Sequence, residues 1–371
     1  MHISTSRSFA VIGAGIAGAH AARELALAGH RVHMFDKARE PGGRLATRRV
    51  KWVDREGHAA TTPLDHGALG FTASSAAFQT FVDLALQAGR LVEWRPALAA
   101  DSLPLEGGAM LYVPTPDMPA LCRHLLDGVP ASLSIAVDGL HKGPFGWQVQ
   151  AAGVRHALKF DAVVLALPPA QAAPLLNPHR LDWARHASIA PMQPCWTLMG
   201  IADVPEPESG WNLARPPSGL LAWALRNDAR PGRASVPEQA HWVAHARAGW
   251  SRRHLEQPAA WVQQQMQAAL AECLGRPVDW HHCTVHRWRY ALPQSHGTAV
   301  APSFWWDAAL GLGVCGDFLG GGGVEGAWLS AQALSAALLQ PASDVACAPT
   351  SHAAAEASDA PNQQASRRLA A

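Results

Sequence analysis

The chain has 371 residues, of which 49% are hydrophobic and 16% are charged, and its formal net charge is +1. This composition is typical of a globular enzyme of about two domains, and it gives no electrostatic reason to expect nucleic acid or an anionic membrane as a partner. The six cysteines form no CxxC pair, so the sequence indicates no disulfide framework, structural zinc site or redox dithiol. Because a strand begins near the first residue and no apolar run reaches the roughly 20 residues of a membrane span, we expect a cytoplasmic protein.

The first predicted elements are a buried strand and a helix, joined by a glycine turn within residues 9–18, Phe-Ala-Val-Ile-Gly-Ala-Gly-Ile-Ala-Gly. Gly13 permits the tight turn, Gly15 lets a pyrophosphate approach the backbone, and Gly18 lets the helix lie close to the sheet. The free N–H groups and the positive dipole end of the helix predict a site that holds a pyrophosphate without a basic side chain. The candidate binding residues of this segment are Gly13, Gly15, Ile16, Ala17 and Gly18.

A second strand completes the unit. The helix has its apolar residues between positions 20 and 28 and stops at Gly29, and the strand covers residues 31–35. The strand ends in Asp36, whose carboxylate can accept both hydroxyls of an adenosine ribose and would repel a 2'-phosphate. Strand, helix, strand and acid together predict a dinucleotide-binding unit of the Rossmann type.

Residues 37–49 contain the run Pro41-Gly42-Gly43-Arg44, which brings a guanidinium to a glycine loop just past Asp36. Arginine is a planar, two-pronged donor that suits the second side of a dinucleotide pyrophosphate; the alternative is an arginine-rich surface loop. The glycine turn and this run together resemble the FAD-binding signature of the glutathione-reductase-like flavoproteins, in the branch that contains amine oxidases, carotenoid-type desaturases and renalases. The candidate cofactor-binding residues added by this run are Lys37, Gly43 and Arg44.

The next elements lead back to the nucleotide-binding sheet. The pattern predicts a hairpin over residues 51–62, a serine-capped helix over 74–89, and a helix that follows the segment 112–121 and ends near Gly128. Strand-like segments are predicted at 133–137, 147–151 and 157–167. The last of these contains a continuous apolar run, which is typical of a parallel sheet covered on both faces.

Residues 171–305 form a long insertion whose alternating segments predict an antiparallel sheet. Its predicted strands are 195–201, 220–225, 241–246 and 285–291, with one helix over 258–274. A final buried strand is predicted at 310–315 and a last helix at 326–339. From residue 341 onward alanine, serine and polar residues lack periodicity, so we expect a disordered tail.

These elements predict an α/β fold with two domains. A Rossmann-type FAD-binding domain of the glutathione-reductase-like kind (GR2-like) would carry a second, α+β substrate domain built on an antiparallel sheet. The FAD-binding domain is predicted to comprise residues 7–60, 131–170 and 306–340, the substrate domain residues 61–130 and 171–305, and the tail residues 341–371.

Segments spread over residues 7–340 resemble the bacterial renalase-like FAD oxidoreductases. These segments are Asp65-His66-Gly67-Ala68, residues 113–121, Leu221-Ala222-Trp223, Trp242, Trp250-Ser251, residues 286–291, Gly316-Asp317 and residues 324–330. The resemblance implies a two-domain flavoprotein with non-covalent FAD. Such a protein would oxidise the 2- and 6-dihydro isomers of NAD(P) and pass the electrons to O2, giving H2O2.

The resemblance also implies roles for individual residues. Gly316 and Asp317 would contact the ribityl and pyrophosphate region of FAD. Gly326 and Ala327 would present backbone N–H groups to the pyrimidine edge of the flavin, and Val137 would contact the adenine through its backbone.

The chain departs from the family pattern near the expected substrate side of the flavin. Leu69-Gly70 stands where relatives have a Gln-Tyr pair, and Gly323 stands where they commonly have arginine. The substrate therefore follows less directly from the resemblance than the family does.

Hydride transfer from a dihydropyridine needs little acid or base help, so the protein must mainly bind, orient and exclude competing reactions. The candidate substrate-pocket residues are the aromatic Trp223, Trp288 and Tyr290, with Arg289 as an anion contact; the alternative is that these aromatic side chains belong to the core. The expected partners are a small-molecule hydride donor and O2, without nucleic acid or membrane, and the protein is expected to be a monomer or a homodimer.

Two other functions are open. A flavin amine oxidase or a desaturase-like enzyme is the first, but the lysine that commonly sits by the flavin in that branch has no counterpart after Lys159, and the tyrosines of the chain are Tyr112 and Tyr290. A pyridine-nucleotide-dependent reductase is disfavoured, because the chain has one glycine fingerprint. A catalytically silent flavin-binding protein is the second.

Two further clusters are expected to be structural. His281, His282, Cys283 and His286 resemble a metal site, but alternate residues of a strand face opposite ways, so we predict no metal there. Asp65 and His66 are adjacent and are predicted to form a structural turn instead of a catalytic dyad.

Overall fold

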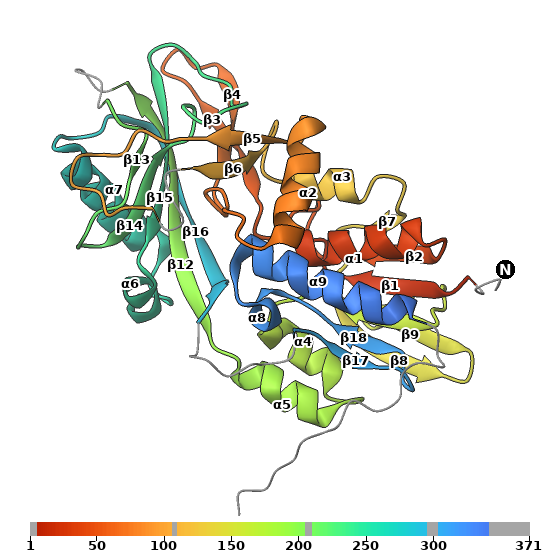
Figure 1. The fold of residues 1–371 in the computed structure, drawn as a ribbon. Coiled ribbons are helices and arrows are strands. Elements are labelled where there is room, and N and C mark those ends of the chain that lie inside the picture. Colours follow the sequence, from red (N-terminus) through yellow and green to blue (C-terminus); the bar gives the residue numbers. More distant parts are fainter. Residues whose placement is uncertain (1–5, 106–109, 205–209, 295–302, 341–371) are drawn as a thin grey trace, which may run out of the picture. The chain divides into compact units, whose positions relative to one another are not determined.

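The computed structural model describes residues 6–105, 110–204, 210–294 and 303–340. Residues up to Leu339 cluster into one compact unit, whose elements are arranged around two main sheets (Figure 1). The predicted disordered tail, residues 341–371, lies outside the described residues.

A six-stranded sheet carries the glycine turn. Its strands, in order across the sheet, are β17 (Trp305–Asp307), β18 (Leu312–Val314), β11 (Ala162–Leu165), β1 (Ser8–Ile12), β2 (Arg31–Phe35) and β7 (Ala131–Ser132). Neighbouring strands run parallel except β17, which pairs antiparallel with β18. Because β1 and β11 are buried along their whole length, their sequences are continuously apolar and do not alternate.

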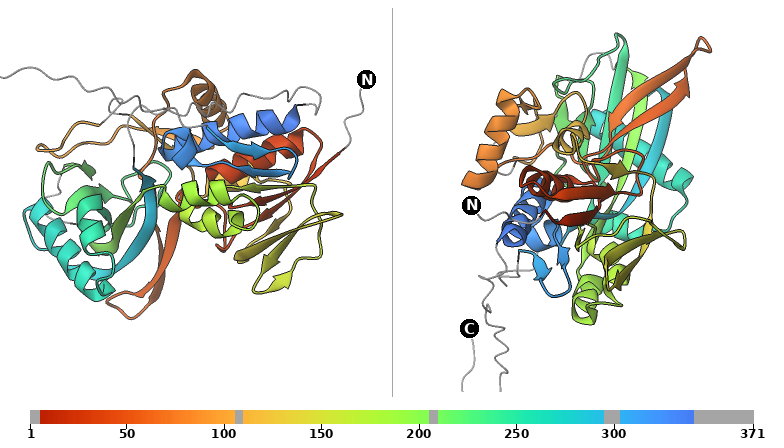
Figure 2. Two further views of the ribbon diagram at one scale, coloured as in Figure 1. Left: turned by 90° about the horizontal axis from the view of Figure 1, so that it is seen from below. Right: turned by 90° about the vertical axis from the view of Figure 1, so that its right-hand side faces the viewer.

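The two faces of this sheet are covered differently (Figures 1 and 2). On one face, α1 (Ile16–Leu27) and α9 (Gly323–Leu339) join residues of β1 in one core cluster. On the other face, the sheet packs against a small sheet of β8 (Val137–Gly143), β9 (Gly146–Ala151) and β10 (Val154–Arg155), together with α4 (Pro169–Leu176) and α5 (Leu181–Ile189). This double covering keeps the glycine turn at the edge of a rigid layer.

The second main sheet is antiparallel. Its strand order is β13 (Leu213–Ala214), β14 (Leu221–Arg226), β15 (Gln239–Ala246), β12 (Met192–Asp203) and β16 (Trp280–Pro293). Its outer face packs against α7 (Ala259–Leu274), with α6 (Ala248–Arg253) beside β12. Its inner face contributes Met199, Leu225 and Val243 to the core cluster that contains α1 and α9. The inner face is therefore continuous with the core of the first sheet.

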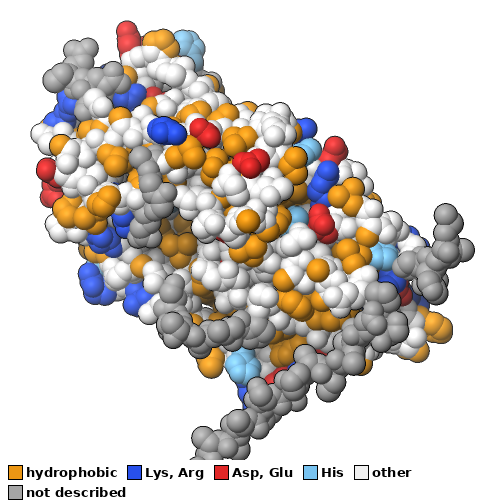
Figure 3. All heavy atoms as spheres, viewed as in Figure 1, with side chains coloured by type: hydrophobic (Ala, Val, Ile, Leu, Met, Phe, Trp, Pro, Cys, Tyr) orange, Lys and Arg blue, Asp and Glu red, His pale blue; other side chains and the backbone are white. Residues whose placement is uncertain are grey.

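Two hairpins and three short helices complete the unit. They are β3 (Thr47–Val53) with β4 (Ala59–Asp65), β5 (Leu91–Trp94) with β6 (Leu111–Pro114), α2 (Ala76–Gln87), α3 (Ala120–Leu125) and α8 (Asp317–Gly320). Among the described helices, none is both long and apolar enough to cross a membrane. Positive and negative side chains are interspersed on the face that Figure 3 shows, which agrees with the net charge of +1.

The α/β fold with an antiparallel second sheet is confirmed, while the division into domains stays a prediction. The predicted strand over residues 133–137 is wrong: β7 ends at Ser132, β8 begins at Val137, and Ser134 between them has φ +59°. Sequence reasoning also missed α4 and α5. Proline usually argues against a helix, but Pro169 occupies the first turn of α4, where a missing amide costs nothing.

Candidate functional site

The glycine turn between β1 and α1 requires glycine at two of its three predicted positions. Gly13 has φ +106°, and its amide donates to the Phe35 carbonyl at 2.8 Å. A Cβ added to Gly18 would lie 1.8 Å from the Gly13 carbonyl oxygen, so a side chain there would push α1 off the turn. A Cβ on Gly15 would instead meet its nearest atom, the Gly43 Cα, at 3.9 Å. Gly15 therefore leaves room that a bound group can use.

The start of α1 is suited to an anion. Its N-cap residue is Gly15, and within the described part of the chain no side chain caps this helix; its first turn also contains no acid. The buried Ile16 and Ala17 belong to this first turn, whose N–H groups have no acceptor within the helix. A pyrophosphate placed there would satisfy these donors and the helix dipole together.

Asp36 holds the glycine turn and the chain beyond it. One carboxylate oxygen accepts from the Ala14 amide at 2.6 Å, and the other accepts from the Ala38 amide at 2.7 Å. The backbone of Asp36 also pairs with Ser132 and Ile135, so the segment that leads to Val137 lies beside it. Asp36 and Val137, the predicted adenine contact, are thus brought to the same end of the sheet.

Lys37 points elsewhere. Its Nζ donates to the Gln171 side-chain oxygen at 3.2 Å in an exposed position. The structure thus gives Lys37 a partner on α4 and no contact with the glycine turn.

Arg44 joins three segments that are far apart in sequence. Its guanidinium makes two hydrogen bonds of 2.7 Å to the two carboxylate oxygens of Asp317, and a third of 3.0 Å to the Ala291 carbonyl. The Asp317 side chain is 2% exposed. A Cβ on Gly43 would lie 3.1 Å from the Gly15 Cα, so the two glycine loops are also adjacent. The predicted residues Gly15, Gly43, Arg44 and Asp317 therefore meet at one place.

The glycines before and within α9 serve the packing of the chain. The Gly316 amide donates to the Ser330 hydroxyl at 3.0 Å. The Gly326 amide donates to the Gly322 carbonyl at 3.1 Å at the start of α9, and its predicted contact with a flavin stays a prediction. A Cβ on Gly320 would lie 1.8 Å from the Gly326 oxygen, which explains the small residues where α8 meets α9. Ala327 is buried beside them.

A row of side chains crosses the inner face of the antiparallel sheet. Trp223 pairs with His245, His245 with Thr197, and Thr197 with His286 across four neighbouring strands. Trp288 lies two residues beyond His286 and therefore shares its face. We call these five residues the inner wall. Tyr290 continues the same alternation and is partly buried.

His66 packs against the inner wall from the opposite side. Its ring stacks on Trp288 with centroids 5.1 Å apart and meets His286 edge to face at 4.9 Å. The Trp288 indole donates to the His66 carbonyl at 3.0 Å. These contacts hold the loop after β4 against the strand β16. Trp288 lies three residues before Ala291, whose carbonyl Arg44 contacts.

Three imidazoles at this wall are held neutral. Burial, with His286, Arg48 and His245 nearby, lowers the pKa of His66 to about 3. Burial also lowers the pKa of His245 to about 4, although a hydrogen bond to the His66 backbone opposes the shift. Burial and the charge of Arg48 lower the pKa of His286. The local environment thus disfavours a positive charge.

Arg289 does not belong to the inner wall. It lies on the opposite face of β16, where its guanidinium pairs with the Glu256 carboxylate at 2.6 and 2.9 Å, and it is exposed. The prediction that it lines the pocket beside Trp288 is corrected by the alternation of the strand. The same alternation separates the histidines that resembled a metal site in the sequence. His281 bonds Asp203 at 2.6 Å, whereas His286 faces inward.

Comparison with known proteins agrees with this geometry. Residues 11–84 match the family described as "NAD(P)-binding Rossmann-like domain". The chain is similar in structure to a candidate protoporphyrinogen oxidase from Exiguobacterium sp. 255-15, with a TM-score of 0.67 and 12% identity over 90% of this chain and 99% of that one. The chain therefore shares the fold of that protein.

Two amine oxidases share this fold. Cyclohexylamine oxidase from Brevibacterium oxydans IH-35A has a TM-score of 0.59 and 14% identity over 91% of this chain and 100% of that one. Putrescine oxidase bound to putrescine has a TM-score of 0.60 and 14% identity over 90% and 99%. At these identities the similarity concerns the fold.

Sequence reasoning missed a buried charge cluster. Asp65 accepts from Arg230 and Arg233 at 2.7 Å each and from Thr47 at 2.5 Å. Arg230 also donates to the Leu69 carbonyl at 2.5 Å. The carboxylate of Asp65 therefore pairs with arginines, which agrees with a structural role instead of a catalytic dyad with His66. Because the arginines lie far along the chain, no local pattern could have indicated this contact.

A second acid holds the other end of the same loop. Glu325, in the first turn of α9, accepts from the Ser74 amide and hydroxyl at 3.0 and 2.8 Å and from the Ser75 amide at 2.6 Å. Burial would raise the pKa of Glu325, but these hydrogen bonds outweigh it and the pKa lies below its ordinary value. The loop from Asp65 to Ser75, which carries Leu69 and Gly70, is thus fixed at both ends.

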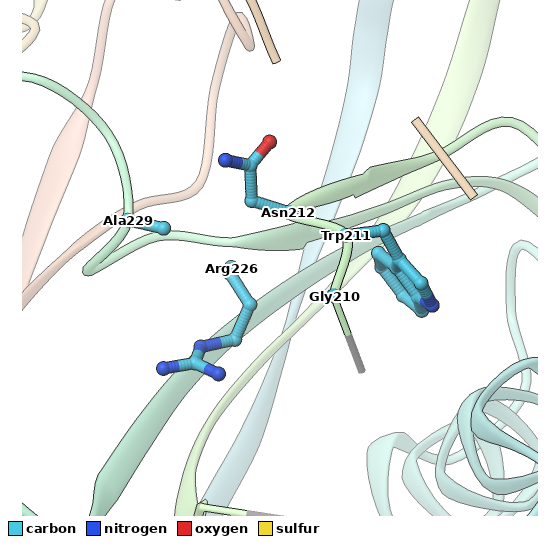
Figure 4. A pocket seen from close by; sticks show the side chains of 5 residues that line it. All are labelled: Gly210, Trp211, Asn212, Arg226 and Ala229. Atoms are coloured by element: carbon cyan, nitrogen blue, oxygen red, sulfur yellow. The ribbon is translucent and has the colours of Figure 1, made fainter. Parts of the chain in front are cut away.

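A separate cavity lies on the far side of the antiparallel sheet. Its volume is about 270 Å³ and its lining consists of Gly210, Trp211, Asn212, Arg226 and Ala229 (Figure 4). Arg226 lies over the ring of Trp242, a residue of the outer-face core. The cavity therefore does not belong to the candidate site.

Proposed function

We propose that this chain is an oxidoreductase that binds FAD non-covalently and takes a hydride from a small-molecule donor, with O2 as the final acceptor and H2O2 as its product. The observation that carries the proposal is the position of Arg44, directly after Gly43 of the second glycine loop. Arg44 binds Asp317 at the start of α8 and the Ala291 carbonyl near the end of β16, the strand that carries Trp288. A dinucleotide site and an aromatic wall thus adjoin.

The described residues fit FAD. Gly15 leaves space over the turn, the start of α1 offers uncapped N–H groups, and Asp36 lies at the ribose end. These residues would hold the dinucleotide, while Arg44 and Asp317 would bind near its pyrophosphate and ribityl chain. When bound, FAD supplies an acceptor for two electrons and one proton.

The neutral wall favours a neutral, planar donor. The environment that lowers the pKa values of His66, His245 and His286 disfavours an alkylammonium as it disfavours an imidazolium. A dihydronicotinamide ring is uncharged, can stack on a tryptophan, and needs no proton acceptor when it loses a hydride. The ring becomes a cation on oxidation, so the same environment favours its release. We therefore propose 2- or 6-dihydro-NAD(P), as in renalases, as the donor.

An amine oxidase is the second candidate, because two of the compared structures are amine oxidases. Against it, Asp65, which precedes the wall contact His66 in the chain, is already paired with two arginines. The third candidate is a protein that binds flavin but catalyses no reaction. The experiment below distinguishes the three candidates.

The test measures the flavin spectrum of the purified protein, first after FAD is added and then during anaerobic mixing with donors. We expect flavin absorbance that is bleached by 2- and 6-dihydro-NAD(P), with ordinary NADH and amines much slower, and H2O2 formed when air is admitted. Absence of bound flavin would overturn the proposal. Fast bleaching by amines would establish the second candidate, and bleaching by no donor the third.

A further inference from the structure

His245 occupies the centre of the inner wall. It lies on β15 and pairs in register with Trp223 on one side and Thr197 on the other. Its Nε2 is buried and has no hydrogen-bond partner among the residues that the structure describes. The Nδ1 of the neighbouring His66 is buried in the same way. Buried polar atoms of native proteins are nearly always paired, so an unpaired nitrogen at a proposed substrate wall requires an explanation.

The protonation of His245 decides what its free nitrogen can do. Burial keeps this imidazole neutral at pH 7 by lowering its pKa to about 4. Its hydrogen bond to the backbone of His66 favours the protonated ring, so that backbone group is an acceptor and the bonded ring nitrogen carries the hydrogen. The other nitrogen of a neutral imidazole has a lone pair. Nε2 of His245 is therefore an acceptor that faces no donor of the described chain.

We propose that Nε2 of His245 accepts a hydrogen bond from the N–H of a primary carboxamide on the hydride donor, and that His245 thereby determines specificity for donors that carry this group. The inference rests on the proposed function. A carboxamide lies on the nicotinamide ring, is uncharged, and brings two N–H donors to a wall with two unpaired buried nitrogens. Leu69 and Gly70, in the loop that follows His66, have no polar side-chain atom.

The test compares two donors that differ in one group. Wild-type protein and the His245→Phe variant are loaded with FAD and mixed anaerobically with 6-dihydro-NAD or with its 3-acetylpyridine analogue, which lacks the N–H. A site built to bond a substrate N–H rejects analogues without it by roughly 10⁴–10⁵-fold, and for a single hydrogen bond between neutral groups we expect about 10-fold in the wild type. In His245→Phe the carboxamide donor should fall to the rate and affinity of the acetyl donor.

Further variants and the comparison of donors keep the result interpretable. His245→Gln retains an acceptor oxygen and should restore part of the preference, whereas His58→Phe changes an exposed histidine of the β3–β4 turn and should leave both rates unchanged. Equal rates with the two donors in the wild type would overturn the inference even if no variant folds. An undiminished preference in His245→Phe would overturn it as well. Reduction by neither dinucleotide would instead contradict the proposed function itself.

Discussion

At the scale of single residues, Asp65 is the acid that holds together the buried charge cluster. Its side chain is 1% exposed, and it faces two guanidinium groups whose side chains are 0% and 4% exposed. Burial lowers the pKa of Arg230 to about 10, which still leaves it charged at pH 7. Removing the acid would leave two positive charges close together in a dry interior.

We therefore expect Asp65→Asn to destabilise the protein by about 3–5 kcal/mol, the usual effect of breaking a buried ion pair. Urea unfolding followed by circular dichroism measures this. The control is Arg55→Ala, which removes an exposed pair with Asp203 and Asp279 and should leave the midpoint unchanged. If Asp65→Asn is as stable as the wild type, the buried cluster does not hold the loop.

His66 is a second residue whose surroundings come from distant parts of the chain. We predicted that it forms no dyad with the adjacent Asp65, and its ring stacks on Trp288, which comes from β16. The neighbours that lower its pKa, among them His286 and His245, also come from distant strands. Only the assembled sheet gives this residue its chemistry.

At the scale of elements, the glycine turn depends on the contact between β1 and α1. Gly18 lies within α1, and the space that a methyl group would need is filled by the Gly13 carbonyl. The helix can therefore lie close to the sheet only if this position carries no side chain.

We expect Gly18→Ala to weaken FAD binding and to lower the stability of the fold. The added methyl group would meet the backbone of Gly13, which cannot swing aside as the end of a flexible side chain can, so the helix itself must move. Gly249→Ala is the matched control: this glycine lies in α6, and its added Cβ meets only an arginine nitrogen at 4.0 Å. It should stabilise the protein by about 0.5–1 kcal/mol through lower chain entropy. Thermal unfolding and FAD titration test both variants, and equal behaviour of the two would contradict this account of the turn.

At the scale of the whole molecule, Arg44 couples the loop of Gly43 to the antiparallel sheet. Its partners belong to the start of α8 and the end of β16, so one guanidinium connects both main sheets. A ligand that binds beside this contact stabilises the folded chain by about 2.7 kcal/mol when present at 100 times its dissociation constant.

We expect Arg44→Ala to reduce the rise in melting temperature that FAD produces, because the variant binds FAD more weakly. Arg180→Ala provides the comparison. Arg180 also bonds two acids, Asp182 and Asp307, so its loss should lower the melting temperature without FAD but leave the FAD-dependent rise intact. The coupling is refuted if both variants respond to FAD as the wild type does. Differential scanning fluorimetry over a range of FAD concentrations provides the measurement.

Local patterns in the sequence determined the elements that depend on neighbours along the chain. The glycine turn, the continuous apolar strands and the period-2 segments of the antiparallel sheet all follow from short-range sterics and burial, and the structure contains them. The position of Arg289 could also have been predicted, because strand alternation already places it opposite Trp288. The structure of residues 133–137 could not have been predicted in this way. The strand β7 ends at Ser132 because its pairing with β2, which comes from a distant segment, ends there.

Tertiary structure decided the chemistry of the site. Arg230 lies 165 positions from Asp65, Ser74 lies 251 positions from Glu325, and Asp317 lies 273 positions from Arg44. His245 has its partners on neighbouring strands. No periodicity encodes such contacts, because they form only when separate elements pack and exclude water. Burial then sets which groups stay neutral and which nitrogen remains unpaired. The sequence thus specified a dinucleotide-binding fold, and the packing of its two sheets specified what that fold can recognise.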